Sequence, residues 1–72
     1  MKQPFELFKE VYIKTGIRKN FLTSSTRYRH VVNARKMFIK LAMAEGYTTS
    51  AIARHLKKDR TTVRYHENNL TL

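Results

Sequence analysis

Residues 57–66 read KKDRTTVRYH and bring together long cationic donors and hydroxyl groups. Guanidinium and hydroxyl groups are side chains that bond base edges and phosphate oxygens in nucleic acids. The candidate base contacts are Arg60, Thr61, Thr62, Arg64 and Tyr65. Tyr65 is also compatible with bonding a phosphate or covering a neighbouring helix. Lys57 and Lys58 are candidate phosphate contacts, whereas Asp59 fits a helix N-cap because phosphates repel a bare carboxylate.

The charge of the chain indicates an anionic partner. Lys and Arg total 15 and Asp and Glu total 5 among 72 residues, which gives a net charge of +10. Such a charge density destabilises a compact fold by self-repulsion unless an anion relieves it. Nucleic acid is therefore the first expectation and a membrane surface the second. A hydrophobic content of 42%, with four Phe and four Tyr, is too high for a disordered polycation.

The length of the chain limits the chemistry it can perform. Residues 1–72 form one small domain, which buries only about 60% of its unfolded surface. We therefore expect function on the surface, no enzymatic activity, no cofactor and no small-molecule substrate. The three histidines share no ligand spacing and Cys is absent, which disfavours a metal site. The hydroxyls around Ser25 lack a positioned base, so we interpret them as a loop that cradles phosphate.

Two features concern the cellular compartment. No apolar run approaches the roughly 20 residues of a membrane span. Glu6 and Glu10 lie where a signal peptide would be apolar, and the absence of Cys fits a reducing compartment. We expect a cytoplasmic protein without a membrane partner.

The elements that position the candidate residues are predicted to be helices throughout, because apolar residues recur at intervals of three and four and no alternating strand pattern occurs. A first helix begins near Pro4 and ends near Gly16. A basic loop over residues 17–26 follows, with Phe21 and Leu22 as anchors into the core. Residues 28–45 form the longest helix. Its broad apolar face, which includes Leu41, Ile39 and Met43, predicts a central helix touched on two sides.

Two short helices complete the predicted fold. Gly46 ends the long helix, and residues 48–50 offer N-caps for a third helix that buries Ile52, Ala53 and Leu56. A fourth helix follows Asp59, with Val63, His66 and Leu70 facing inward. The prediction is a compact, all-α domain of four helices. Two short helices joined by about three residues are typical of a helix-turn-helix, whose second helix enters the major groove with its N-terminal residues foremost.

Two segments resemble a known family. Residues 24–49, SSTRYRHVVNARKMFIKLAMAEGYTT, and residues 58–63, KDRTTV, are similar to the C-terminal double-stranded DNA-binding domain of the bacterial replication initiator DnaA, in the Trp-repressor-like helix-turn-helix group. The similarity extends over about residues 5–70. It implies that Arg27 enters the minor groove, to which we add Arg29, and that residues 60–62 read bases. It also implies phosphate contacts by Arg35, Lys36, Thr48, Thr49 and Ser50.

Departures from the family pattern modify these expectations. Arg60 replaces a histidine of the signature, and its fork favours guanine O6 and N7, so a different base preference is expected. The turn lacks the family's glycine pair, which leaves Lys57 and Lys58 to form it. No G-x-x-x-x-G-K-[ST] loop is present, so the resemblance implies the binding module alone.

The predicted function is sequence-specific binding of double-stranded DNA, with the recognition helix in the major groove and the basic loop in the minor groove. We expect a regulator of transcription or replication from a phage or other mobile element, nucleoid-associated in a bacterial cell. Without a heptad seam, a monomer is expected, with paired copies on adjacent sites as the alternative. A basic helical adaptor or inhibitor of an acidic protein is the competing function. RNA binding is disfavoured because single-strand recognition usually uses an open sheet.

Overall fold

The computed structural model describes residues 2–25 and 27–68. This part of the chain contains five helices and no strand: α1 (Pro4–Thr15), α2 (Lys19–Leu22), α3 (Arg29–Ala44), α4 (Thr49–Leu56) and α5 (Arg60–Asn68). The all-α class is confirmed. The helix number is corrected from four to five, because the predicted 17–26 loop contains the single turn α2. The amides of Phe21 and Leu22 donate to the Arg18 carbonyl to start that turn.

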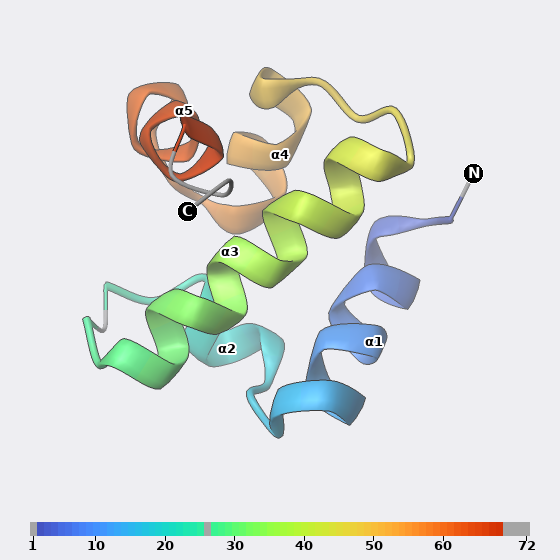
Figure 1. Ribbon diagram of the computed structural model, residues 1–72, viewed down its shortest axis with the longest axis vertical. Coiled ribbons are helices and arrows are strands. Elements are labelled where there is room, and N and C mark those ends of the chain that lie inside the picture. Colours follow the sequence, from blue (N-terminus) through green and yellow to red (C-terminus); the bar gives the residue numbers. More distant parts are fainter. Residues whose placement is uncertain (1, 26, 69–72) are drawn as a thin grey trace.

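Helix α3 is the centre of the fold and contacts each of the other helices. Figure 1 shows α3 running diagonally through the molecule, with α1 and α2 on one side and α4 and α5 on the other. A helix that is packed on two sides needs apolar residues over a wide arc of its surface. The broad apolar face of the sequence therefore correctly predicted a central helix.

The core gathers around Phe38 of α3, whose ring stacks on Phe8 of α1 with centroids 4.3 Å apart. Leu22 of α2 is fully buried, as predicted. Phe21, its predicted fellow anchor, is 51% exposed, because α2 is a single turn and buries only one side. On α3, Ile39 is buried as predicted, whereas Met43 is exposed. The buried apolar residues contributed by the last two helices are Ile52, Ala53, Leu56 and Val63, all predicted.

The helix ends follow local rules. Gly16 adopts the left-handed conformation, with φ 76°, and its amide donates to the Tyr12 carbonyl at 2.7 Å to close α1. The Thr48 hydroxyl accepts from the Ala51 amide at 3.2 Å, which caps α4 as predicted. Glu10 of α1 forms ion pairs with Lys2 at 3.0 Å and with Lys14 at 3.4 Å.

Candidate nucleic-acid interface

The α4–α5 connection is tight and is built without glycine. Lys57 closes α4 in the left-handed conformation, with φ 56°, and it is the non-glycine residue with positive φ in the described chain. The Lys58 amide donates to the Ala53 carbonyl at 3.0 Å, the six-to-one bond of a Schellman motif. The residues predicted to form the turn therefore do so. Left-handed backbone costs a residue with a Cβ roughly 1–2 kcal/mol, so this turn carries strain that glycine would lack.

The first turns of α4 and α5 border one polar cavity of about 460 Å³, here called the α4–α5 notch. It is lined by Thr48, Thr49, Ser50, Arg60, Thr61 and Arg64. Arg60 Nη1 donates to the Ser50 hydroxyl at 3.5 Å across it. The lining holds two guanidinium groups and hydroxyls but no carboxylate, and the N-terminal end of the α4 dipole adds positive potential. The notch thus brings six of the predicted site residues around one surface suited to an anion.

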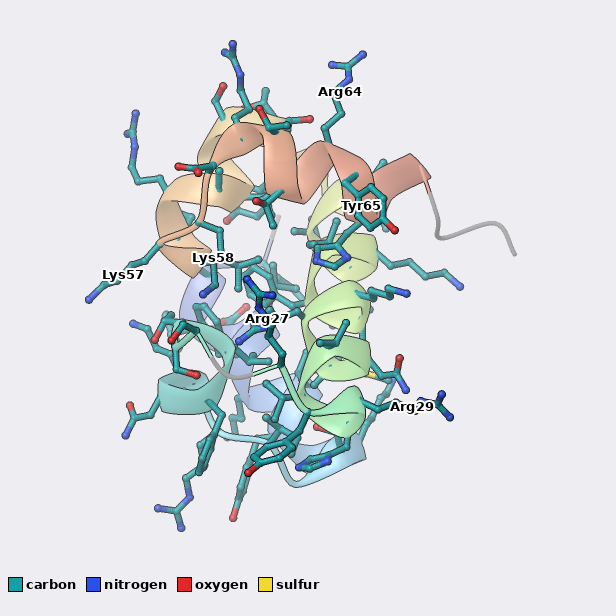
Figure 2. The ribbon with its side chains drawn as sticks, turned by 90° about the vertical axis from the view of Figure 1, so that its left-hand side faces the viewer. Arg27, Arg29, Lys57, Lys58, Arg64 and Tyr65 are labelled. Carbon is teal, nitrogen blue, oxygen red and sulfur yellow. The ribbon has the colours of Figure 1, made fainter. Side chains whose placement is uncertain are left out.

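The exposed side of α5 carries the predicted base contacts. Arg60, Thr61, Thr62 and Arg64 are exposed, and Tyr65 is 65% exposed, whereas Val63 is buried against the fold. Figure 2 shows Arg64 pointing outward from the end of the molecule formed by α5. The division between an outward polar face and an inward apolar one matches the prediction. Leu70, predicted to face inward, lies outside the described residues.

Ser25 and Arg27, which precede α3, and Arg29, the first residue of α3, are exposed. In Figure 2, Arg27 is directed toward the α4–α5 turn, where Lys58 is drawn, whereas Arg29 points to the other side of α3. The two arginines predicted for one narrow groove therefore diverge. Only Arg27 extends on the side of the turn that leads into α5.

Arg35 does not belong to this surface, and its predicted phosphate contact is corrected. It is only 5% exposed. Its Nε donates to the Leu22 carbonyl at 2.8 Å, and its Nη2 donates to the carbonyls of Phe21 at 3.2 Å and Ser24 at 2.7 Å. These carbonyls lie at the C-terminal end of α2 and just beyond it, and the Phe21 carbonyl also accepts from the Ser24 amide and hydroxyl. The guanidinium thus closes the end of α2 instead of facing solvent, while its neighbour Lys36 stays partly exposed.

Lys58 has a similar internal role, which corrects its assignment to phosphate. Its Nζ donates to the Ser24 carbonyl, the same acceptor that Arg35 uses. Burial, and after it the charge of Arg35, lowers the pKa of the Lys58 ammonium. We call the two cations and their shared acceptor the Ser24 clasp. It ties the α4–α5 turn to the loop that carries Arg27. Lys57, by contrast, is exposed and points away from the fold (Figure 2).

A spacing rule could have identified Arg35. Val31, Phe38, Ile39 and Ala42 are buried on α3, and position 35 lies four residues from two of them on the same stripe. The family resemblance implies a phosphate contact at Arg35, whereas the spacing along α3 predicts an inward position. No local signal could have identified Lys58, because its acceptor is 34 residues away along the chain.

His66 belongs to α5 and is half-buried, as predicted. Its Nδ1 is buried and has no hydrogen-bond partner among the described residues. Burial lowers the pKa of His66, and the charges of Lys36 and Arg35 lower it further. Protonation of the imidazole is disfavoured because it would place a buried charge near two cations.

Asp59 immediately precedes α5, and its carbonyl accepts from the Val63 amide at 3.1 Å. The capping bond of its carboxylate stays a prediction. Within residues 2–25 and 27–68, no three or more His, Asp or Glu side chains gather where they could hold a metal ion, and no helix is both long and apolar enough to cross a membrane.

No family model, curated protein sequence or solved structure matches the chain. The role of the α4–α5 surface is accordingly argued from its geometry and charge.

Proposed function

We propose that this protein binds double-stranded DNA in a sequence-dependent way, with α5 in the major groove and the Arg27 loop in an adjacent minor groove. α4 and α5 then act as a helix-turn-helix. The observation that carries the proposal is the α4–α5 notch, where two arginines and four hydroxyl groups from the first turns of two helices surround a polar cavity without a carboxylate.

The notch fits a backbone phosphate. Backbone amides at a helix start donate to phosphate oxygens, and the helix dipole favours the negative charge. Thr49 and Ser50 add hydroxyl donors at the same place. Arg64 adds a positive charge on a side chain that is already exposed. Such contacts fix the register of a protein on the duplex without reading sequence.

Sequence would be read by the exposed side of α5. Arg60 is at the first position of the helix, and its hydrogen bond to Ser50 is at the long limit, so exchanging it for a bond to DNA costs little. A bidentate contact of arginine with guanine is worth about 1–3 kcal/mol of discrimination. Thr61 and Thr62 follow it, and their methyl groups can contact thymine.

The minor-groove contact is assigned to Arg27 alone. A narrow minor groove has an enhanced negative potential that attracts an inserted guanidinium. Arg29 points to the other side of α3, so we assign it to the phosphate backbone together with Lys36 and Lys57. With Arg35 and Lys58 engaged internally, about four to six phosphates would be neutralised, which gives a log–log salt slope of about −4 to −5.

The proposal is tested by selecting bound fragments from random duplex DNA and measuring affinity for the best site and for a random duplex. Arg60→Ala should weaken the best site by about 1–3 kcal/mol and relax one base position. Arg18→Ala is the matched control, since it removes the same charge at the N-cap of α2, on the other side of α3.

Equal losses for Arg60→Ala on specific and random duplexes would remove Arg60 from base reading. If the selection returns no preferred sequence, and the protein instead binds an acidic protein after nuclease treatment, the adaptor function replaces DNA binding. Stronger binding of single-stranded RNA than of duplex DNA in a gel-shift assay would likewise contradict the proposal.

A further inference from the structure

A second surface lies between α1 and α2, on the other side of α3 from α5 (Figure 1). It is an open groove of about 420 Å³, here called the α1–α2 groove, within the roughly 300–1,000 Å³ range of ligand pockets. Its lining residues are Phe5, Phe8, Lys9, Tyr12, Arg18 and Lys19. Three aromatic rings thus share one groove with three cations.

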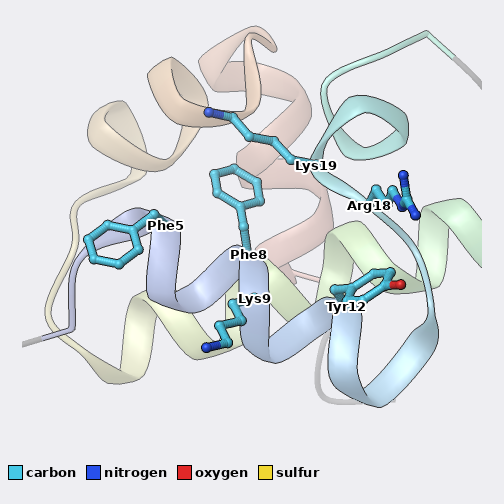
Figure 3. A pocket seen from close by; sticks show the side chains of 6 residues that line it. All are labelled: Phe5, Phe8, Lys9, Tyr12, Arg18 and Lys19. Carbon is cyan, nitrogen blue, oxygen red and sulfur yellow. The ribbon is translucent and has the colours of Figure 1, made fainter.

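Two of the three rings are covered at least in part. One face of Phe8 stacks on Phe38, and Lys19 Nζ lies 5.2 Å from the centroid of the same ring, necessarily over the other face. Arg18 lies over Tyr12 at 5.8 Å. Figure 3 shows Lys19 extending across Phe8 and Arg18 beside Tyr12, with Phe5 at the opposite end of the groove. A nucleic-acid base needs an open ring face for stacking, and Phe8 does not offer one.

What the groove offers is apolar contact flanked by positive charge. Phe5 is 69% exposed, which is unusual for a large apolar side chain that borders a cavity. No acidic residue lines the groove, and Glu10 on the same helix is already paired with Lys2 and Lys14. An occupant therefore needs apolar side chains and its own negative charge. A second copy of the chain fails the second requirement because each copy carries +10.

We propose that the α1–α2 groove binds an acidic segment of a partner protein. The segment places one or two large apolar side chains against Phe5 and Tyr12, and its carboxylates face Lys9, Arg18 and Lys19. The three cations that line the groove supply the charge complementarity that selects an acidic partner. This inference concerns a different surface from the α4–α5 notch and does not depend on DNA binding.

The test uses the full chain and a short synthetic peptide with a central Leu-Phe pair flanked on both sides by Asp and Glu. Binding is followed residue by residue from amide chemical shifts. We expect the shifts to concentrate on α1 and α2 and to persist when duplex DNA is added. Replacing the acids of the peptide with Asn and Gln, or its Leu-Phe pair with Ser-Ser, should each weaken binding about tenfold, because charge and apolar contact are both required.

Matched variants assign the effect to the groove. Phe5→Ser should weaken binding about tenfold, whereas Ile13→Ser, on the same helix with 70% exposure and outside the groove, should not change it. Lys9→Gln should weaken binding more than Lys40→Gln, an exposed lysine of α3. Far-UV circular dichroism of each variant checks the fold.

Several outcomes overturn the inference. They are the absence of groove shifts at about 1 mM peptide, equal effects of Phe5→Ser and Ile13→Ser, or shifts that map to α4 and α5 and disappear with duplex DNA. Displacement of the peptide from the groove by a single-stranded oligonucleotide or by anionic phosphatidylglycerol vesicles would also overturn it. Because duplex DNA enters only as a competitor, loss of the DNA-binding function would leave this result unaffected.

Discussion

Replacing Arg35 with lysine separates a structural role from a DNA contact. Arg35→Lys keeps the positive charge, which a phosphate contact needs, but it removes the planar fork that reaches three carbonyls. An ammonium on a shorter stem can satisfy one of these acceptors, so two hydrogen bonds are lost. At a net contribution of about 1 kcal/mol each, the free energy of unfolding should fall by about 2 kcal/mol. For a domain of this size, that lowers Tm by about 8–16 °C.

The assay is thermal and denaturant unfolding followed by far-UV circular dichroism. Lys36→Arg is the control, because the neighbouring side chain is partly exposed and its change should alter stability by less than about 0.5 kcal/mol. An Arg35→Lys variant that melts within about 2 °C of the parent would refute the reasoning, because it would mean that the carbonyls of α2 do not depend on the guanidinium.

Three further predictions concern the α4–α5 turn and His66. Lys57→Gly should raise the free energy of unfolding by about 0.5–1 kcal/mol, because glycine adopts the left-handed conformation without a Cβ clash, whereas Lys57→Ala should not; equal Tm values for the two variants would contradict this. Lys58→Met removes one hydrogen bond to the Ser24 carbonyl and should lower the free energy of unfolding, measured in urea, by about 1 kcal/mol. The loss stays this small because the same carbonyl keeps its bond to Arg35. The pKa of His66 is lower in the folded state than its unfolded value of 6.5. The free energy of unfolding is therefore highest above pH 6.5, where His66 is neutral in both states, and it decreases as the pH falls through the folded pKa. Unfolding measured across this range should therefore show stability that rises with pH, and His66→Gln should flatten the dependence; an unchanged slope would exclude His66 as its source.

The sequence predicted the elements whose pattern repeats along one helix. The periodicity that placed Val63 inward also placed Arg60, Thr61 and Arg64 outward, and all four positions are confirmed. Thr48 was identified as a cap because capping is a local hydrogen bond, here to an amide three residues on. Local rules therefore covered both helices that border the α4–α5 notch.

Predictions failed where a side chain finds its partner far along the chain. Periodicity predicts a loop at α2, because one helical turn has too few residues for a periodic signal. The carbonyls of Leu22 and Phe21 in this turn accept from Arg35, 13 and 14 residues away along the chain. Phe21 was expected in the core, but a single turn buries one side only, and Leu22 occupies that side. The sequence does not predict the α1–α2 groove, because the groove forms only where α1 and α2 lie side by side.

The net charge of +10 includes cations that bond the protein's own backbone as well as cations that are exposed. Arg35 and Lys58 are directed at backbone carbonyls, so they hold Ser24, just beyond α2, against the α4–α5 turn and do not neutralise a ligand. They share the Ser24 carbonyl, and Arg27 follows that residue by three positions. Any displacement of the turn therefore moves the acceptor that anchors the loop. If α5 and Arg27 contact neighbouring grooves of one duplex, their relative register is set by this single carbonyl, and the fold uses part of its positive charge to position the remainder.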